Sequence, residues 1–188
     1  MKTLIIYSHP YEKSYNHAIL ERIVSLLKES GKDFDIIDLY KDGFNPIYTS
    51  EELRLYSTGQ TTDPLVEKYQ KMITDASDIV FIFPIWWYDL PAILKGFIDK
   101  VFKKNFSYID TPTGIKGNIN HINSTTVLTT SEAPTWFIRF FAGNSIKSVF
   151  INSTLKQLGI KNVTWKNMGK IKNVSQEKRQ LFLKNLKF

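Results

Sequence analysis

The chain has 188 residues, of which 43% are hydrophobic and 23% are charged, and it contains no cysteine. This length supports one domain with a hydrophobic core, and the lack of thiols excludes disulfides, thiolate metal sites and a cysteine nucleophile. The formal charge is +7, but the basic residues are scattered among acidic ones, including those of KVFKK at 100–104, so we expect a solvated surface and no nucleic-acid site.

The sequence shows no pattern typical of a membrane span, a signal peptide or a metal site. No apolar run approaches the roughly 18 residues that cross a bilayer, so we expect no membrane insertion. The first residues, MKTLIIYSHP, form neither a long apolar segment nor a cleavage site of the kind found in signal peptides, which predicts a cytoplasmic protein. His9, His17 and His121 lack the spacing of metal ligands, so no metal site is predicted.

Strands and helices are predicted to alternate along the chain. The predicted strands are short apolar runs, at 2–8, 33–40, 77–84, 124–131 and 161–167. The predicted helices have apolar residues at helical spacing, with Asp63 and Pro64 placed to start the second of them, at 14–30, 63–76, 90–102, 144–159 and 175–188. Polar connections are expected at 43–62 and 104–123.

This order predicts a doubly wound α/β fold, with a five-stranded parallel sheet covered by helices on both faces. We found no internal repeat and no linker, so residues 1–188 are expected to form a single domain. Ligands of such sheets bind beyond the carboxyl ends of the strands. The chemistry should therefore lie in the loops that follow the first, third and fourth strands.

The first of these loops, SHPYEKSYNHA at 8–18, is a candidate phosphate site. Ser14 and Asn16 stand at the start of a predicted helix, where free N–H groups and the positive helix end attract anions. Neither a GxGxxG nor a P-loop motif is present, so side chains must contribute. The structural alternative is that Ser14 is only a helix N-cap.

The second loop belongs to the segment FPIWWYDLPAILKGFIDKVF. It places Trp86, Trp87 and Tyr88 between Pro84, which ends a strand, and Pro91, which begins a helix. Large aromatic residues often fill a core, which is the structural alternative. At the edge of a sheet, however, little interior remains to be filled, so these rings are interpreted as a wall for a flat, apolar ligand.

The third loop is TTSEAPTW at 129–136. Its small polar residues can present N–H groups and hydroxyls to the edge of a planar heterocycle, where they would stabilise negative charge. An ordinary polar loop is an equally good interpretation of this segment alone.

Together these segments resemble the flavodoxin-like NAD(P)H:quinone oxidoreductases, the family of DT-diaphorase and of short bacterial quinone reductases. HPYEKSYNHA and the long aromatic segment are similar to the two signature segments of that family. DLYKDGFNP, NFSYIDTPTGIKGN, TTSEAPTW and STLKQLGIKN are similar to its other segments. Nearly the whole chain therefore takes part in the resemblance.

The resemblance implies a flavodoxin-like fold and a bound flavin. It places the flavin phosphate or pyrophosphate against four residues of the first loop, His9, Ser14, Tyr15 and Asn16. It places the isoalloxazine ring along the second loop, at Pro84, Ile85, Trp86, Trp87 and Tyr88. The polar edge of the ring would face the third loop, at Thr129, Thr130, Ser131, Glu132 and Ala133.

The implied activity is hydride transfer from NAD(P)H to flavin N5 and then two-electron reduction of a quinone in the same place, within a homodimer. No protein group is named as catalytic, although Trp87 and Tyr88 are candidates for stacking on the substrate. FMN is favoured because a helix-end phosphate pocket suffices for it, with FAD as the alternative if residues 43–70 or 104–118 make space for adenosine.

One departure from the family concerns charge on the reduced ring. Its animal members use a tyrosine and a histidine in and after the third loop, whereas this chain has Trp136 and no histidine there. N–H groups around Ser131 to Ala133, or Arg139, are the proposed substitutes.

Two alternative functions of the protein stay open: a flavin-binding ancillary subunit of a potassium efflux transporter, and a non-enzymatic flavodoxin-like electron carrier. The segments LRLYS and WFIRFFAG are either interface surface or loops packed on the core.

Overall fold

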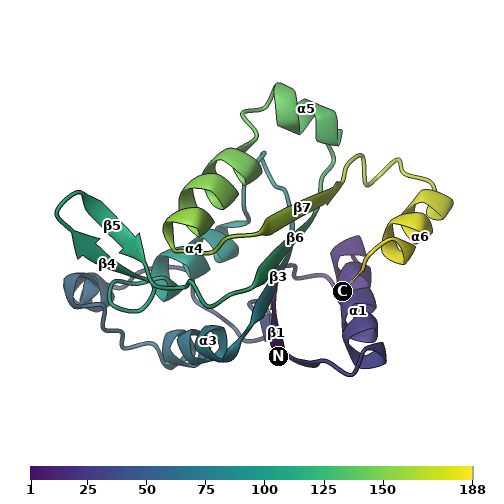
Figure 1. Ribbon diagram of the computed structural model, residues 1–188. Coiled ribbons are helices and arrows are strands. Elements are labelled where there is room, and N and C mark those ends of the chain that lie inside the picture. Colours follow the sequence, from purple (N-terminus) through teal and green to yellow (C-terminus); the bar gives the residue numbers. More distant parts are fainter. Residues whose placement is uncertain (188) are drawn as a thin grey trace.

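The structure, a computed structural model, describes residues 1–187 and contains one large parallel sheet (Figure 1). Its five strands pair in the order β2-β1-β3-β6-β7. They span β1 Lys2–Tyr7, β2 Asp33–Asp38, β3 Asp78–Pro84, β6 Ser124–Thr130 and β7 Val163–Met168. The order reverses beside β1, because the chain adds β2 on one side and β3, β6 and β7 on the other. The predicted doubly wound fold is confirmed.

Helices cover both faces of this sheet. In Figure 1, α1 and α6 lie on one side, and α3, α4 and η2 lie on the other. Their bounds are α1 Tyr15–Glu29, α3 Pro64–Asp75, α4 Ala92–Val101, α6 Gln176–Lys184 and the π-helical η2 Ile146–Leu155. The predicted helix at 175–188 reaches Phe188, which lies outside the described residues. No helix among residues 1–187 combines the length and the apolar character that a bilayer crossing requires.

Local signals in the sequence explain where these helices begin and end. Ser14 caps α1 by accepting the N–H of His17 at 3.1 Å, and the chain leaves that helix through Gly31, whose φ is +64°. Asp63 caps α3 and is followed by Pro64 in the first turn, as predicted.

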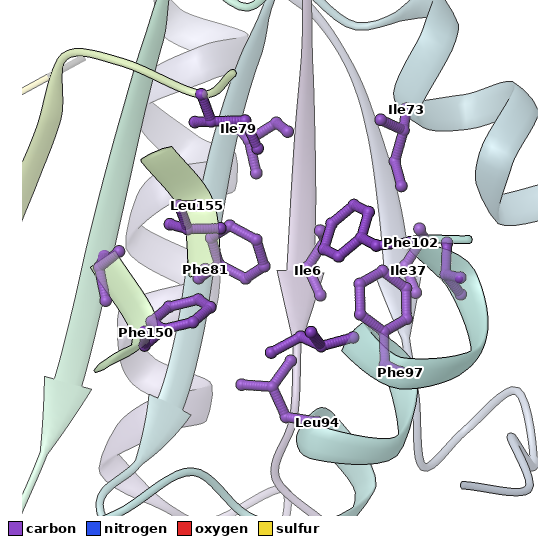
Figure 2. Packing of buried hydrophobic residues seen from close by; sticks show 14 of the residues in the cluster. Ile6, Ile37, Ile73, Ile79, Phe81, Leu94, Phe97, Phe102, Phe150 and Leu155 are labelled. Atoms are coloured by element: carbon purple, nitrogen blue, oxygen red, sulfur yellow. The ribbon is translucent and has the colours of Figure 1, made fainter. Parts of the chain in front are cut away.

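The core lies in two layers because neighbouring residues of a strand point to opposite faces. Ile6, Phe81 and Val127 are aligned on adjacent strands and face α3, α4 and η2. Figure 2 shows this layer, with Phe97 of α4 and Phe150 of η2 packed onto the strands. The alternate residues of the same strands face α1 and α6.

Three regions differ from the expected loops. The connection at 43–62 contains the helix α2 (Ser50–Arg54) and the 3₁₀ turn η1 (Tyr56–Thr58). The polar segment at 104–123 contains an antiparallel hairpin, β4 Tyr108–Thr111 and β5 Gly114–Gly117. The third loop ends early, because α5 (Thr135–Phe140) begins one residue before its expected end.

The expectation of a fully solvated basic surface is wrong for two lysines. Lys100 and Lys103 are 1% and 0% exposed. The ammonium group of Lys100 lies 2.8 Å from Asp63 and 3.4 Å from Glu52, and Lys103 donates to the carbonyl of Gln60 at 2.9 Å. These partners make burial possible, because a buried charge is tolerated when it is paired and hydrogen-bonded.

Candidate active site

The carboxyl ends of β1, β3 and β6 bring the three predicted loops together. A cavity of about 390 Å³ is lined by residues of the second and third loops and by one residue of α5. The lining residues are Ile85, Trp86, Trp87, Tyr88, Ser131, Glu132, Ala133 and Ile138. Seven of these eight were predicted from the sequence, and Ile138 was not.

The aromatic residues at this cavity form a tight two-residue turn. Trp86 and Asp89 exchange both backbone hydrogen bonds, at 3.1 and 3.0 Å. Between them Trp87 and Tyr88 have φ angles of 49° and 65°. A turn with both central residues in the left-handed region is type I′, which normally favours asparagine and glycine. Bulky residues in this conformation store strain, and such strain is concentrated at functional sites.

The exposure of these rings tests whether they fill the core. Trp87 is 94% exposed, and Trp86 and Tyr88 are 42% and 41% exposed. None of the three fills the core, so the alternative interpretation of the aromatic segment as interior packing is wrong. The serine hydroxyl of Ser145, just before η2, donates to the carbonyl of Tyr88 and connects the turn to that helix.

The first loop lies beside the aromatic turn. The rings of His9 and Trp86 are 6.0 Å apart between centroids. Nδ1 of His9 accepts the N–H of Tyr11 at 3.1 Å, and burial lowers the pKa of His9 below its usual value. The neutral ring is therefore favoured in the folded protein.

Asn16 joins the first loop to the third. It is buried, and its Nδ2 donates to Oγ1 of Thr130 at 2.8 Å, while its Oδ1 has no partner among the described residues. The hydroxyl of Ser8, at the end of β1, is likewise buried without a partner in residues 1–187. Ser8 was not singled out in the sequence, although its position directly after a buried strand was the available signal.

Two predicted residues direct their polar groups elsewhere. Tyr15 donates its hydroxyl to the carbonyl of Arg179 at 2.6 Å, on the side of α6, and burial raises its pKa to about 12. Thr129 is fully buried, donates to Asn167 at 2.8 Å and accepts from the indole of Trp165 at 2.9 Å. Neither hydroxyl is available to a ligand in this arrangement.

The third loop is held in place by β7. Asn167 donates to the hydroxyl of Ser131 at 2.9 Å, and the N–H of Ser131 donates to the carbonyl of Met168 at 3.0 Å. The N–H of Ser131 is therefore occupied by a hydrogen bond to β7, which corrects the expectation that it faces a ligand. The N–H groups of Glu132 and Ala133 donate to no acceptor within residues 1–187.

The contacts also show where the backbone at Pro84 and Ile85 and the side chain of Arg139 lie. Pro84, the last residue of β3, is buried and pairs with Thr130, and Ile85 donates its N–H to the carbonyl of Thr130 at 2.7 Å. Arg139 does not line the cavity, because its guanidinium lies over the ring of Trp165, 5.2 Å from the centroid. Within the described residues, no cluster of three potential metal ligands occurs.

Comparisons with known proteins identify the family of this chain. A family model described as flavodoxin-like fold matches residues 1–186. An uncharacterized NAD(P)H oxidoreductase of Haemophilus influenzae is 29% identical over 184 residues, which cover 97% of this chain and 91% of that protein. An NAD(P)H:quinone oxidoreductase from Methanothermobacter marburgensis has 27% identity and a TM-score of 0.85, over 98% of this chain and 92% of the other. The chain belongs to the flavodoxin-like NAD(P)H:quinone oxidoreductase family.

Members of this family differ in length. NAD(P)H dehydrogenase [quinone] 1 of Cavia porcellus is 28% identical over 153 residues, 72% of this chain, and the match spans only 55% of the animal protein. The chain thus spans nearly all of the microbial relative and about half of the animal one. Its relatives identify it as an enzyme of the NAD(P)H oxidoreductase class.

Proposed function

We propose that this enzyme is a flavin-dependent two-electron reductase of quinones or similar acceptors, that FMN is its cofactor, and that residues 1–188 act as one flavin-binding domain. The observation that carries the proposal is the cavity of about 390 Å³ between the aromatic turn and the third loop. It lies at the carboxyl edge of the sheet, beside the reversal of strand order, where doubly wound folds bind their ligands.

The residues at the start of α1 fit a phosphate. The N–H groups of Tyr15 and Asn16 donate to no acceptor in residues 1–187, as is usual in the first turn of a helix. The unpartnered hydroxyl of Ser8 can donate to a phosphate oxygen, whereas the unpartnered amide oxygen of Asn16 only accepts and would suit a hydroxyl group of the cofactor. Buried polar groups are almost always hydrogen-bonded, so a ligand is the natural partner for these two. His9, Ser14 and the backbone of Tyr15 would complete the contacts.

The cavity fits a planar heterocycle. Trp86, Trp87 and Tyr88 supply flat apolar surface on one wall, and the free N–H groups of Glu132 and Ala133 supply donors on the other. Donors placed before charge develops stabilise that charge without further reorganisation. These two N–H groups are therefore the proposed substitutes for the tyrosine and histidine of the animal enzymes.

A bound flavin would supply the two-electron chemistry between a nicotinamide and a quinone. The protein's own contribution is to hold each substrate in turn against one face of the cavity and to exclude water. Trp87, the most exposed of the three rings, is the proposed stacking surface for the substrate.

FMN is proposed over FAD because of where the spare segments lie. Residues 104–118 form the region of the β4–β5 hairpin, on the side of the sheet opposite α1 (Figure 1). Residues 43–70 lead into α3 on the same side, and Lys100 of α4 donates to the carbonyl of Asn45 at 2.8 Å. The position of both segments away from α1 supports FMN as the cofactor.

The proposal is tested by the absorbance spectrum of the purified protein. We expect bands near ~370 and ~450 nm, release of FMN on heating, bleaching on anaerobic addition of NADH or NADPH, and recovery with a quinone. Release of FAD would contradict only the cofactor choice. A protein that takes up neither flavin on reconstitution would refute the proposed function.

A further inference from the structure

A second cavity, of about 520 Å³, lies between η2 and the edge strand β7 and is strongly basic. We call it the basic cavity. Its lining residues are Arg139, Phe140, Asn144, Lys147, Ile151, Asn152, Lys156, Lys161, Asn162, Val163 and Trp165. Four of them are cationic and none is a carboxylate. The basic cavity was not apparent in the sequence, where these residues are spread over 27 positions, from 139 to 165.

The four cations have no acidic neighbours to neutralise them. Arg139, Lys147, Lys156 and Lys161 form no ion pair with any residue in the described part of the chain. By contrast, Lys95, which lines another cavity, lies 2.6 Å from the carboxylate of Asp99. Four unpaired cations around one cavity repel one another, and an anion would relieve that repulsion.

Two further groups are arranged to bind an anion. The guanidinium of Arg139 lies over the indole of Trp165, 5.2 Å from the ring centroid, which restricts its orientation. The side chain of Asn144 has a buried amide oxygen without a partner in residues 1–187. Because the oxygen and nitrogen of an amide exchange places by a flip, the same side chain can present N–H donors.

The basic cavity is separate from the candidate active site. Ile138 lines the active-site cavity and the next residue, Arg139, lines the basic cavity, so the short helix α5 divides the two. No residue lines both. A ligand of the basic cavity would therefore not displace the flavin, and its binding does not depend on the proposed function.

We propose that the basic cavity binds a soluble molecule that carries several adjacent phosphate groups. A single phosphate cannot contact cations distributed over a cavity of this size, whereas a chain of phosphates can. Arg139, Lys147, Lys156 and Lys161 all line this one cavity, which favours a compact ligand over a nucleic-acid strand.

The test is isothermal titration of the flavin-loaded protein with inorganic tripolyphosphate, with orthophosphate in parallel. We expect saturable binding of tripolyphosphate and much weaker binding of orthophosphate. The double variant Lys156→Gln, Lys161→Gln should raise Kd for tripolyphosphate by about tenfold or more, because two charge-assisted contacts are lost. Both lysines are exposed, so the variant should fold normally, which circular dichroism would verify.

The control variant Lys32→Gln, Lys68→Gln changes the net charge equally. Both residues are exposed and unpaired among the described residues, and they lie before β2 and in α3, away from β7. An equal loss of affinity in both double variants would indicate unspecific attraction and overturn the proposal. Equal affinity for orthophosphate would also overturn it. Binding only to vesicles containing phosphatidylglycerol, or only to an oligonucleotide, would assign the basic cavity to a lipid surface or a nucleic acid instead.

Discussion

Individual side chains at the carboxyl edge of the sheet determine how the candidate site can act. Asn16 is the clearest case, because one end of its amide is used by Thr130 and the other has no partner among the described residues. In the sequence it was only one polar residue at a helix start. Its burial and its contact with β6 make it a link between the phosphate loop and the loop proposed to face the flavin ring.

Asn16→Ala is therefore expected to lower flavin occupancy and the free energy of unfolding of the flavin-free protein, the latter by about 1–3 kcal/mol, because Thr130 loses its buried partner. Thr130→Val removes the same hydrogen bond but keeps the amide. If the amide contacts the flavin, Thr130→Val should retain more flavin than Asn16→Ala at comparable stability. Asn120→Ala, at an exposed position, is the control. Equal flavin retention in both site variants would place Asn16 outside the flavin contacts.

His9 should make stability depend on pH. Burial lowers its pKa in the folded protein below 6.5, so the unfolded chain takes up a proton first as the pH falls. The stability contributed by the neutral ring is present above pH 6.5 and is lost below it. Urea unfolding of flavin-free protein at about pH 7.5 and 5.5 should show a larger decrease in wild type than in His9→Asn. Identical decreases would show that other groups carry the pH dependence.

Among the elements, the aromatic turn shows a conflict between local preference and function. Trp87 is almost fully exposed and adopts a left-handed conformation, so it contributes little to the core while its backbone is strained. Natural sequences place such conflicts at functional sites and compensate for them elsewhere. Here the neighbouring prolines and the double hydrogen bond between Trp86 and Asp89 maintain the turn.

Two variants at Trp87 separate strain from binding. Trp87→Asn should stabilise the flavin-free protein by about 1 kcal/mol, because asparagine tolerates the left-handed region. Trp87→Ala should give no such gain, because alanine keeps the strain. Both should lose flavin or substrate affinity with the ring, measured by fluorescence titration, and stability should be measured by urea unfolding. Flavin binding and turnover at wild-type levels in both variants would count against the proposed stacking role.

A second element-scale feature is the attachment of residues 43–63 to α4. Lys100 is buried between Asp63 and Glu52, and the carboxylate of Glu52 also belongs to a capping box with Thr49 at the start of α2. The pattern Thr-x-x-Glu at 49–52 was a readable signal for this short helix. The pairing of Glu52 with Lys100 was not, since it joins residues 48 positions apart.

Lys100→Met should destabilise the protein by about 3–5 kcal/mol, because it leaves the buried Glu52 and the partly buried Asp63 without their counter-charge. The matched control is Lys95→Met on the same helix, whose ion pair with Asp99 is exposed and should contribute less than about 1 kcal/mol. Thermal unfolding of both variants checks this. A loss of stability in Lys100→Met no greater than in Lys95→Met would show that Lys100 is dispensable for packing.

At the scale of the whole molecule, the homodimer that the family resemblance implies has a candidate surface on the η2 side of the sheet. A cavity of about 580 Å³ there is lined by Tyr56, Ile115 and Val149, which are 46%, 36% and 56% exposed, together with other residues of α4, η2 and the hairpin. Exposed apolar residues around a cavity are typical of an interaction surface. This supports the interpretation of LRLYS as interface surface.

We therefore expect light scattering of the purified protein to give twice the 21.8 kDa of one chain. Val149→Glu should shift the protein toward the monomer, because a buried unpaired carboxylate is costly. Leu181→Glu is the matched control, since Leu181 is also 56% exposed but lies on α6 at the opposite face (Figure 1). A monomeric wild type would refute the dimer, and a dimeric Val149→Glu would move its interface elsewhere.

The sequence by itself determined the order and type of the main elements and the three loops of the site. Apolar periodicity is a local property, and the positions of strand ends follow from it, so Trp86, Asn16 and Ser131 were placed at one edge before any contact was known. Only the tertiary structure decided which polar groups of the site residues remain free to bind a ligand. The hydroxyls of Tyr15 and Thr129 are taken by α6 and β7, and the buried Lys100 and the basic cavity arise from residues distant in the chain. Hydrogen-bond partners and burial are set by packing between elements, which local sequence patterns do not encode.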